Sequence, residues 1–457
     1  MMADRSKAEV VLDLFGVNLE QQGRGFYVSL ELLAIARGVY ELDASALLDA
    51  DAAVVSYVRA SHDLARRIAV GADIDQQTLA RSVDDSDTLA TLQALTSSLL
   101  VEIPGRRKSP NWYNAHLYPF VGELIHYDAA ERHEAGMPRG TRAPHIERYV
   151  FRDGGEWAYR VLRKDQNGPR RASTREGLIE LVRDSDTPLG EIAHSLRAHD
   201  HAKESDPYEA RTEHEIETYE HLSPWPEHLR RGINFIVSRD GVPRAKRIES
   251  LMHWAPYCLA RHQLHLARTA LRQPLEDVYV DFGREATTLR RLSQDSLEAF
   301  RKNVVNAIIE RATRFHDKAI NEGDDARAKR YARHMKPSAS GTGSPRSFFS
   351  ETLAAVGALN ATAGRRHFTM KPPMLEAVVA ATLEPGTEEE YYNFCTRIYD
   401  EYRIVVDERT ADEHDLTFDV DASVFRRNSD AFRASLGATG LLTQYSDATS
   451  IVRGEPR

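Results

Sequence analysis

Apolar side chains recur every three or four residues over long stretches of this chain, and this spacing limits its fold more than any other feature. In residues 292–320, one stripe collects five large apolar side chains: Leu297, Phe300, Val304, Ile308 and Phe315. Charged residues lie on the opposite side of that stretch, as on an amphipathic helix. Residues 31–40 and 46–70 space Leu, Ile and Val in the same way. The sequence therefore predicts a mainly α-helical protein.

The middle of the chain has a different pattern, which predicts α+β insertions. Residues 148–152 and 157–162 roughly alternate apolar and polar side chains around an Asp-Gly-Gly turn at 153–155, which predicts a β-hairpin. A second hairpin is predicted over residues 233–248, around Asp-Gly at 240–241. Alternation at 278–282 predicts a short strand. Residues 177–183 return to the helical spacing.

Changes of pattern divide the 457 residues into five segments, so we expect a multidomain chain. Pro, Gly and Ser are dense from Lys336 to Arg346, which predicts a linker. The segments are an N-terminal helical region (1–105), an α+β middle region with hairpins (106–283), a basic helical region (284–335), the linker (336–346) and a winged-helix-like domain (347–457).

The C-terminal segment has the clearest order of elements. Helices are predicted over 374–383 and 388–402, the second beginning at a capping box of Thr387 and Glu390. A strand at 404–406 and a helix at 429–436 follow. The closing segments 441–445 and 449–453 predict a two-stranded ribbon. Helices that end in such a ribbon are typical of a winged helix.

Two leucines and a Ser-Asp-Ala ending stand between Leu441 and Ala448, directly after the last predicted helix. This ending and the helix before it resemble uncharacterised proteins of bacterial anti-phage defence islands. The resemblance covers the C-terminal region alone. It implies a part in antiviral defence alongside partner proteins of the same system, and it implies no catalytic residues.

The charge balance argues against a typical nucleic-acid-binding chain, because 60 Lys and Arg stand against 69 Asp and Glu, a net charge of −9. Residues 284–346 are the exception, with 14 basic and 8 acidic residues. Seven cations are candidate phosphate contacts for duplex DNA: Arg327, Lys329, Arg330 and Arg333 before the linker, and Arg426, Arg427 and Arg433 around the last predicted helix. The alternative interpretation of such a run is a solvated helix face.

Familiar catalytic motifs are missing from the sequence. It contains no GxxxxGK[ST] phosphate loop, no GxSxG, no HExxH and no CxxC pair. Two cysteines, Cys258 and Cys395, cannot form a disulfide framework or a four-cysteine zinc site, so we expect a reducing compartment. We find no signal peptide and no long apolar run, and therefore expect a cytoplasmic protein without a membrane partner.

Histidine is the one residue type that suggests another chemistry. Six of the 18 histidines lie between His194 and His228. On a helix, His214, Glu217 and His221 would share one face and could hold a divalent metal. Their very polar surroundings favour a solvated helix instead, so we expect no cofactor. A second group, His253, Cys258, His262 and His265, lies among apolar residues, which favours core histidines.

The sequence as a whole favours a non-enzymatic adaptor or DNA-associated component of a bacterial multi-protein system. Its expected partners are other proteins of that system and duplex DNA. The alternative function is a metal-dependent phosphohydrolase or nuclease that uses the histidine-rich middle region.

Overall fold

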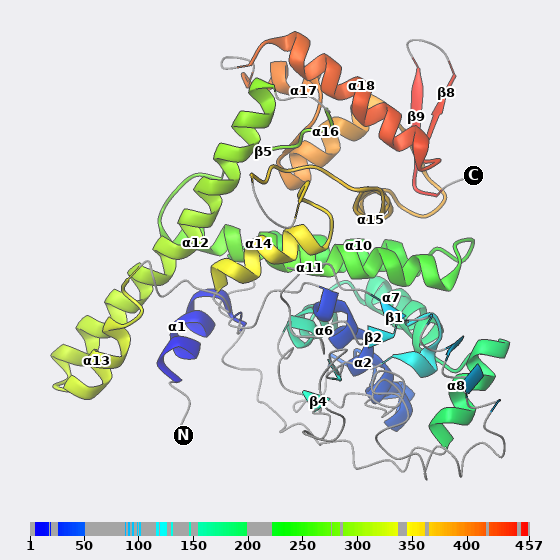
Figure 1. Cartoon of the computed structure of the whole chain (residues 1–457), viewed down its shortest axis with the longest axis horizontal. Coiled ribbons are helices and arrows are strands. Elements are labelled where there is room, and N and C mark those ends of the chain that lie inside the picture. Colours follow the sequence, from blue (N-terminus) through cyan, green and yellow to red (C-terminus); the bar gives the residue numbers. More distant parts are fainter. Residues whose placement is uncertain are drawn as a thin grey trace. The chain divides into compact units, whose positions relative to one another are not determined.

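The computed structural model describes most of the chain and groups it into two compact units (Figure 1). The described residues are 5–17, 19, 26–50, 154–198, 222–336 and 345–455, with gaps at 276, 284–286, 362–364, 417–419 and 446–448, and short pieces between 87 and 147. The first unit holds residues 1–25, 215–242 and 249–457, and the second holds residues 26–214 and 243–248. Grouping by contact does not test the five predicted segments, which remain a prediction.

Helices make up most of the first unit, as the apolar spacing predicts. In chain order they are α1 (Arg5–Phe15), α10 (Trp225–Val237), α11 (Arg244–Ala270, whose first turn is grouped with the second unit), α12 (Thr288–Asn321), α13 (Asp325–Ala332), α14 (Pro345–Ala355), α15 (Pro372–Thr382), α16 (Tyr391–Tyr402), α17 (Glu408–Glu413) and α18 (Ala422–Ala438).

Helix α12 is the longest of the described helices, at 34 residues. The Thr287 hydroxyl begins it by accepting a hydrogen bond from the Arg290 amide at 3.2 Å. The predicted stripe is confirmed: Leu297, Phe300 and Val304 are buried. Near the other end, Ala312 and Ala319 pack in one apolar cluster with residues of α1 and α13.

The strands of the first unit are short. β5 (Val278–Tyr279) pairs in parallel with β7 (Ile404–Val405). β6 (Glu388–Glu390), β8 (Leu442–Gln444) and β9 (Ser450–Arg453) form an antiparallel sheet in the order β6-β9-β8. Thr443 of β8 lies opposite Ile451 of β9, which confirms the predicted C-terminal ribbon. The predicted strands near 278 and 404 are confirmed as well.

The second unit contains α2 (Phe26–Leu42), α6 (Gly154–Arg163), α7 (Gly168–Val182) and α8 (Pro188–Ala198). Its short strands pair as β1 (Leu100–Val101) with β2 (His116–Leu117), and as β3 (Ala129–Ala130) with β4 (Ile146–Glu147). The described residues of this unit also form two 3₁₀ turns, η1 (Ala44–Ala46) and η4 (Gly122–Leu124). Helices α2 and α6 pack closely, and the Gly155 amide donates to the buried Glu31 carboxylate at 2.7 Å.

Both predicted hairpins of the middle region are wrong, because 157–162 and 233–237 are helical. Residues 148–152, the other half of the first predicted hairpin, lie outside the described residues. Residues 154–163 form α6, and all of its residues are buried. The polar residues of the alternating pattern are therefore buried as well, and do not form the exposed face of a sheet. Residues 225–237 form α10, and the Asp-Gly at 240–241 lies in the loop before α11. Within α10, Ile233, Ile236 and Val237 are buried at helical spacing.

The predicted capping box at 387–390 is also wrong. The Thr387 hydroxyl donates to the Glu384 carbonyl at 2.7 Å, and residues 388–390 form β6. Glu390 itself caps α16, accepting from the Tyr392 amide at 2.8 Å. Helix α18 begins seven residues earlier than predicted, where the Asp421 carboxylate accepts from the Ser423 amide at 2.7 Å.

Within the part of the chain that the structure describes, none of the helices combines the length and the apolar character needed to cross a membrane.

Gly232 allows α10 to approach its neighbours closely, and this predicts the effect of a methyl group. A Cβ at Gly232 would lie 2.2 Å from Trp254 Nε1 and 2.9 Å from Ala381 Cβ. We expect Gly232→Ala to lower the free energy of unfolding by about 2 kcal/mol, because overpacking displaces buried groups. The measurement is urea denaturation.

Gly437→Ala is the matched control, because Gly437 is also helical and nothing lies within 4 Å of its added Cβ. This variant should be as stable as the wild type or slightly more stable, since Ala favours a helix over Gly. Equal stability of the two variants would contradict the close approach.

Candidate functional site

The basic residues predicted before the linker lie on and just after α13. Ala328 and Tyr331 are buried against α12, which turns Lys329, Arg330 and Arg333 to solvent. Arg327 is different, because its Nε donates to the Tyr331 hydroxyl at 3.0 Å. Three of the four predicted phosphate contacts are therefore exposed, and the fourth supports the packing of α13.

The three predicted arginines of α18 divide in the same way. Phe425, Phe432 and Leu436 bury one face of the helix, and Arg426 and Arg427 are exposed on the other. The Arg433 guanidinium lies over the Tyr391 ring, 4.4 Å from its centroid, and over the Tyr392 ring at 4.9 Å. Arg433 therefore packs within the protein.

The two groups of cations lie at opposite ends of α12. Leu289, in its first turn, packs in one cluster with Phe425 of α18, whereas Ala319, in its last turn, packs with Tyr331 of α13. A helix of 34 residues is about 50 Å long. The structure thus does not join the seven cations into one small patch.

Charge separates the two groups further. Residues 372–455 hold 7 Lys and Arg against 17 Asp and Glu. Several of these cations form ion pairs with carboxylates: Arg397 lies 2.9 Å from Glu389, and Arg453 lies 3.0 Å from Glu388. The surroundings of α18 are thus acidic, which opposes contact with a phosphate backbone.

The predicted metal ligands His214, Glu217 and His221 lie outside the described residues. Among the residues that are described, no group of three or more His, Cys, Asp or Glu could hold a metal ion. In the second histidine group, Cys258 and His262 are buried, and His253 Nδ1 lies 2.8 Å from the Val356 carbonyl oxygen. His265 differs from these, because it lines a cavity.

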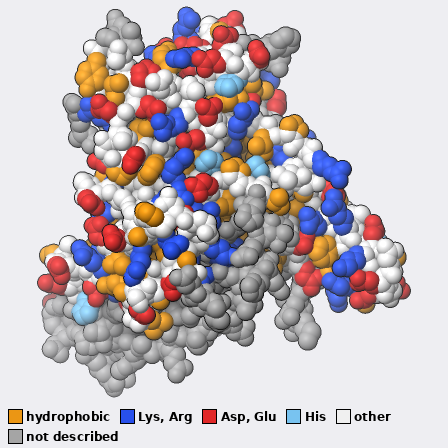
Figure 2. Space-filling model, turned by 180° about the vertical axis from the view of Figure 1, so that it is seen from behind, with side chains coloured by type: hydrophobic (Ala, Val, Ile, Leu, Met, Phe, Trp, Pro, Cys, Tyr) orange, Lys and Arg blue, Asp and Glu red, His pale blue; other side chains and the backbone are white. Residues whose placement is uncertain are grey.

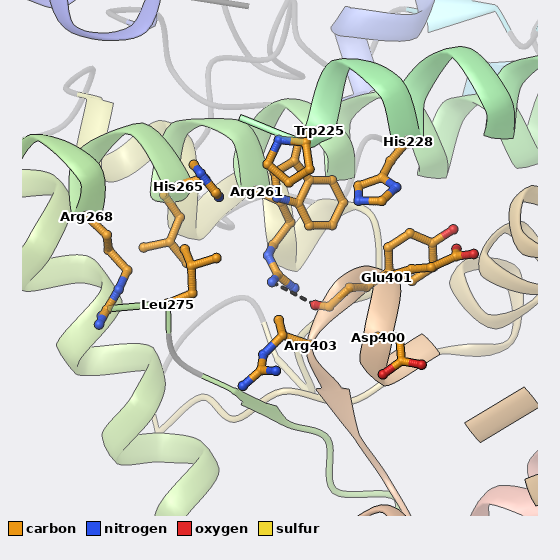
Figure 3. Close-up of a pocket in the computed structure, with 12 residues that line it drawn as sticks. Trp225, His228, Arg261, His265, Arg268, Leu275, Asp400, Glu401 and Arg403 are labelled. Carbon is orange, nitrogen blue, oxygen red and sulfur yellow. Dashed lines mark hydrogen bonds between the residues drawn. The ribbon is translucent and has the colours of Figure 1, made fainter. Parts of the chain in front are cut away.

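This cavity, of about 350 Å³, lies among α10, α11 and the end of α16 (Figure 3). Its walls combine apolar side chains with cations. Its lining includes Trp225, His228, Arg261, Leu264, Leu275 and Glu401, together with Asp400, Tyr402 and Arg403.

Arg261 is the central cation of the cavity, and only 6% of its surface is exposed. Its guanidinium carbon lies 4.8 Å from the Trp225 ring centroid. One terminal nitrogen donates to the Tyr257 hydroxyl at 3.0 Å, and the other donates to the Tyr402 carbonyl at 2.9 Å. All of these partners are neutral groups.

The carboxylates of the cavity wall are directed elsewhere. Glu401 forms an ion pair with Arg231, which is outside the lining, and Asp400 is exposed. In Figure 3 both carboxylates point away from the guanidinium group of Arg261. Arg403, which ends α16 in the left-handed backbone region (φ 58°), is paired with Asp277 at 2.7 Å.

Two histidines border the same cavity. Burial lowers the pKa of His228 to about 4, with a further contribution from the positive charges of Arg231 and Arg261. A hydrogen bond to the Glu401 backbone opposes this shift. Burial and the Arg261 charge also lower the pKa of His265. The positive field in this region thus disfavours further positive charge.

Sequence reasoning missed this cavity, although it singled out His265. Arg261 stands four residues before His265 on α11 and shares its helix face, a spacing that the sequence shows. Trp225 and Tyr402 come from distant parts of the chain, and nothing in the sequence alone joins them to Arg261.

The lowered pKa of His228 predicts a pH effect on stability. Between pH 6.5 and about 4, the unfolded chain binds a proton at this residue that the folded chain does not bind. The contribution of His228 to the free energy of unfolding therefore falls as the pH drops through this window. We expect His228→Gln to make the acid-side decline shallower in urea denaturation across the window.

His194→Gln, at an exposed position of α8, is the control for this measurement. If both variants decline with pH as steeply as the wild type, the folded protein binds this proton as readily as the unfolded chain, and the pKa of His228 is not lowered.

Comparisons of the chain with models of protein families, with curated proteins and with solved structures found no match in any of the three. The resemblance of the C-terminal residues to defence-island proteins therefore remains an expectation.

Proposed function

We propose that this chain is a cytoplasmic, non-enzymatic adaptor of a bacterial multi-protein system with a part in anti-phage defence. In this proposal the exposed cations of α13 and of the turn after it contact the backbone of duplex DNA. The C-terminal elements form a winged-helix-like domain that docks to partner proteins of the same system.

The observation that carries the DNA contact is the outward face of α13. Lys329, Arg330, Arg333 and Lys336 are all exposed, and the buried Tyr331 holds the helix that presents them. No ion pair forms at Lys329, Arg330 or Lys336 with any described residue. Lys and Arg side chains are frequent on the arm formed by α12 and α13, with acids among them (Figure 2). Cations on such a face can contact the phosphate backbone of a duplex, and such contacts do not read the base sequence.

The order of the C-terminal elements supports the winged-helix assignment. Helices α15, α16 and α18 are followed by the β8–β9 ribbon, and β6 lies between α15 and α16. The sheet order β6-β9-β8 places the first strand beside the last, as in a winged helix. β7 and α17 are inserted between α16 and α18.

The acidic balance around α18 supports protein docking by this domain. An acidic surface is repelled by the dense phosphate charge of a duplex, whereas it can complement a basic patch on a protein. Exposed Arg426 and Arg427 are then minor contributors to DNA binding, and Arg433 is a packing residue.

We expect weak binding that depends on salt and is indifferent to DNA sequence. Three or four phosphate contacts imply a slope of about −3 in a plot of log affinity against log salt concentration. Changing Lys329, Arg330 and Arg333 together to Glu should abolish binding, as measured by fluorescence anisotropy of labelled duplexes at several salt concentrations. Arg327 is left unchanged, because its bond to Tyr331 supports α13.

The control is the double variant Arg426→Glu/Arg427→Glu, which reverses two exposed cations of α18. It should retain most of the affinity. If this variant loses binding and the α13 variant retains it, the DNA contact lies on α18 and not on α13. A wild-type chain that fails to bind at low salt would refute the DNA contact and leave the protein-docking part of the proposal.

A further inference from the structure

We propose that the cavity beside Arg261 binds a small organic anion, whose carboxylate or phosphate group meets the Arg261 guanidinium and whose body is apolar. This site is independent of the DNA contact at α13 and of the docking surface of the C-terminal domain. Arg261 supplies a buried charge without a carboxylate partner, and the cavity has room for the rest of the ligand.

Arg261 is a buried cation without an anionic partner. No carboxylate of the described residues contacts it, and its neighbours are two aromatic rings, a hydroxyl and a carbonyl. Tyr402, whose carbonyl accepts from Arg261, is the last residue of α16, so the helix end supplies a partial negative charge of about half a unit. This compensates Arg261 in part, and a buried charge is costly unless it is fully paired.

Arg239, another buried arginine of the first unit, has different partners from Arg261. It is 2% exposed, and its guanidinium is 3.1 Å from the Glu455 carboxylate. It also donates to the Ala380 and Leu383 carbonyls. Arg239 thus has a carboxylate where Arg261 has none, and an anion in the cavity would supply the missing charge.

Arg261 also has an unused donor. Its two terminal nitrogens donate to Tyr257 and Tyr402, while the buried Nε has no hydrogen-bond partner among the described residues. The Arg239 Nε also lacks a partner among the described residues, so the missing carboxylate, and not this donor, distinguishes Arg261. A guanidinium matches the geometry of carboxylate and phosphate oxygens, so either group could accept this bond.

The cavity sets the size and polarity of the rest of the ligand. A volume of about 350 Å³ exceeds that of a bare phosphate ion and is within the range of small-molecule sites. Trp225, Leu264 and Leu275 form apolar walls. Of the acids, Glu401 is neutralised by Arg231, and Asp400 is exposed and turned away from Arg261 (Figure 3). The ligand is therefore an anion carried on an apolar body the size of one ring.

The test uses titration calorimetry of the full chain with four probes. Benzoate and phenyl phosphate carry the two anionic groups on the same ring, benzamide is the neutral analogue, and inorganic phosphate lacks the ring. We expect at least one aromatic anion to bind, and benzamide and inorganic phosphate to bind at least about tenfold more weakly. The stronger of the two anions identifies carboxylate or phosphate as the recognised group.

Two variants locate the binding. Arg261→Gln removes the charge, and Leu275→Trp narrows the cavity at a residue that is 46% exposed, so the second should fold even if the first does not. Each should weaken the tighter anion at least about tenfold. Arg409→Gln, at an exposed arginine of α17 outside the cavity, should leave the affinity unchanged.

Three outcomes would overturn the proposal. The first is the absence of binding by both aromatic anions at about 10 mM. The second is equal binding of benzamide, which would mean a merely apolar cavity. The third is unchanged affinity in Leu275→Trp and, if that variant folds, in Arg261→Gln. This result would place the bound anion elsewhere on the chain.

Discussion

Burial of one stripe of α12 is the interaction on which the first unit depends. Near its start, Leu289 packs with Phe425 of the C-terminal elements, and near its end Ala319 packs with α1 and α13. The same helix therefore supports two surfaces of opposite charge. Removing its apolar stripe would release α13, since a helix of 8 residues is too short to be stable without such packing.

Much of this architecture could be predicted from the sequence, because α12 buries one stripe and β9 buries alternate residues. Leu297, Phe300 and Val304 repeat at helical spacing, and the ribbon lies in the closing segments 441–445 and 449–453 that predict it. The prediction failed at residues 154–163, where the whole helix is buried and the apolar pattern loses its period. It also failed at 233–248, where a turn motif between two helices was interpreted as a hairpin.

The sites follow the same logic. Exposed cations next to one another in the sequence, such as Lys329 and Arg330, could be found without a structure. The cavity could not, because Trp225, Arg261 and Tyr402 meet only through tertiary packing. Even for the predicted cations, the sequence did not distinguish Arg330, which is exposed, from Arg433, which lies over tyrosine rings. That difference depends on which face of each helix is buried in the core.

Under the proposed DNA contact, the length of α12 sets the distance along a duplex between α13 and α18. Its 34 residues span about 50 Å, and base pairs stack about 3.4 Å apart. A duplex lying parallel to the helix would therefore run for about fifteen base pairs between the two ends, close to one and a half turns. After a half-integral number of turns, the groove facing the protein has changed from major to minor or the reverse. A protein held at the α18 end would meet the groove opposite in kind to the one that faces α13.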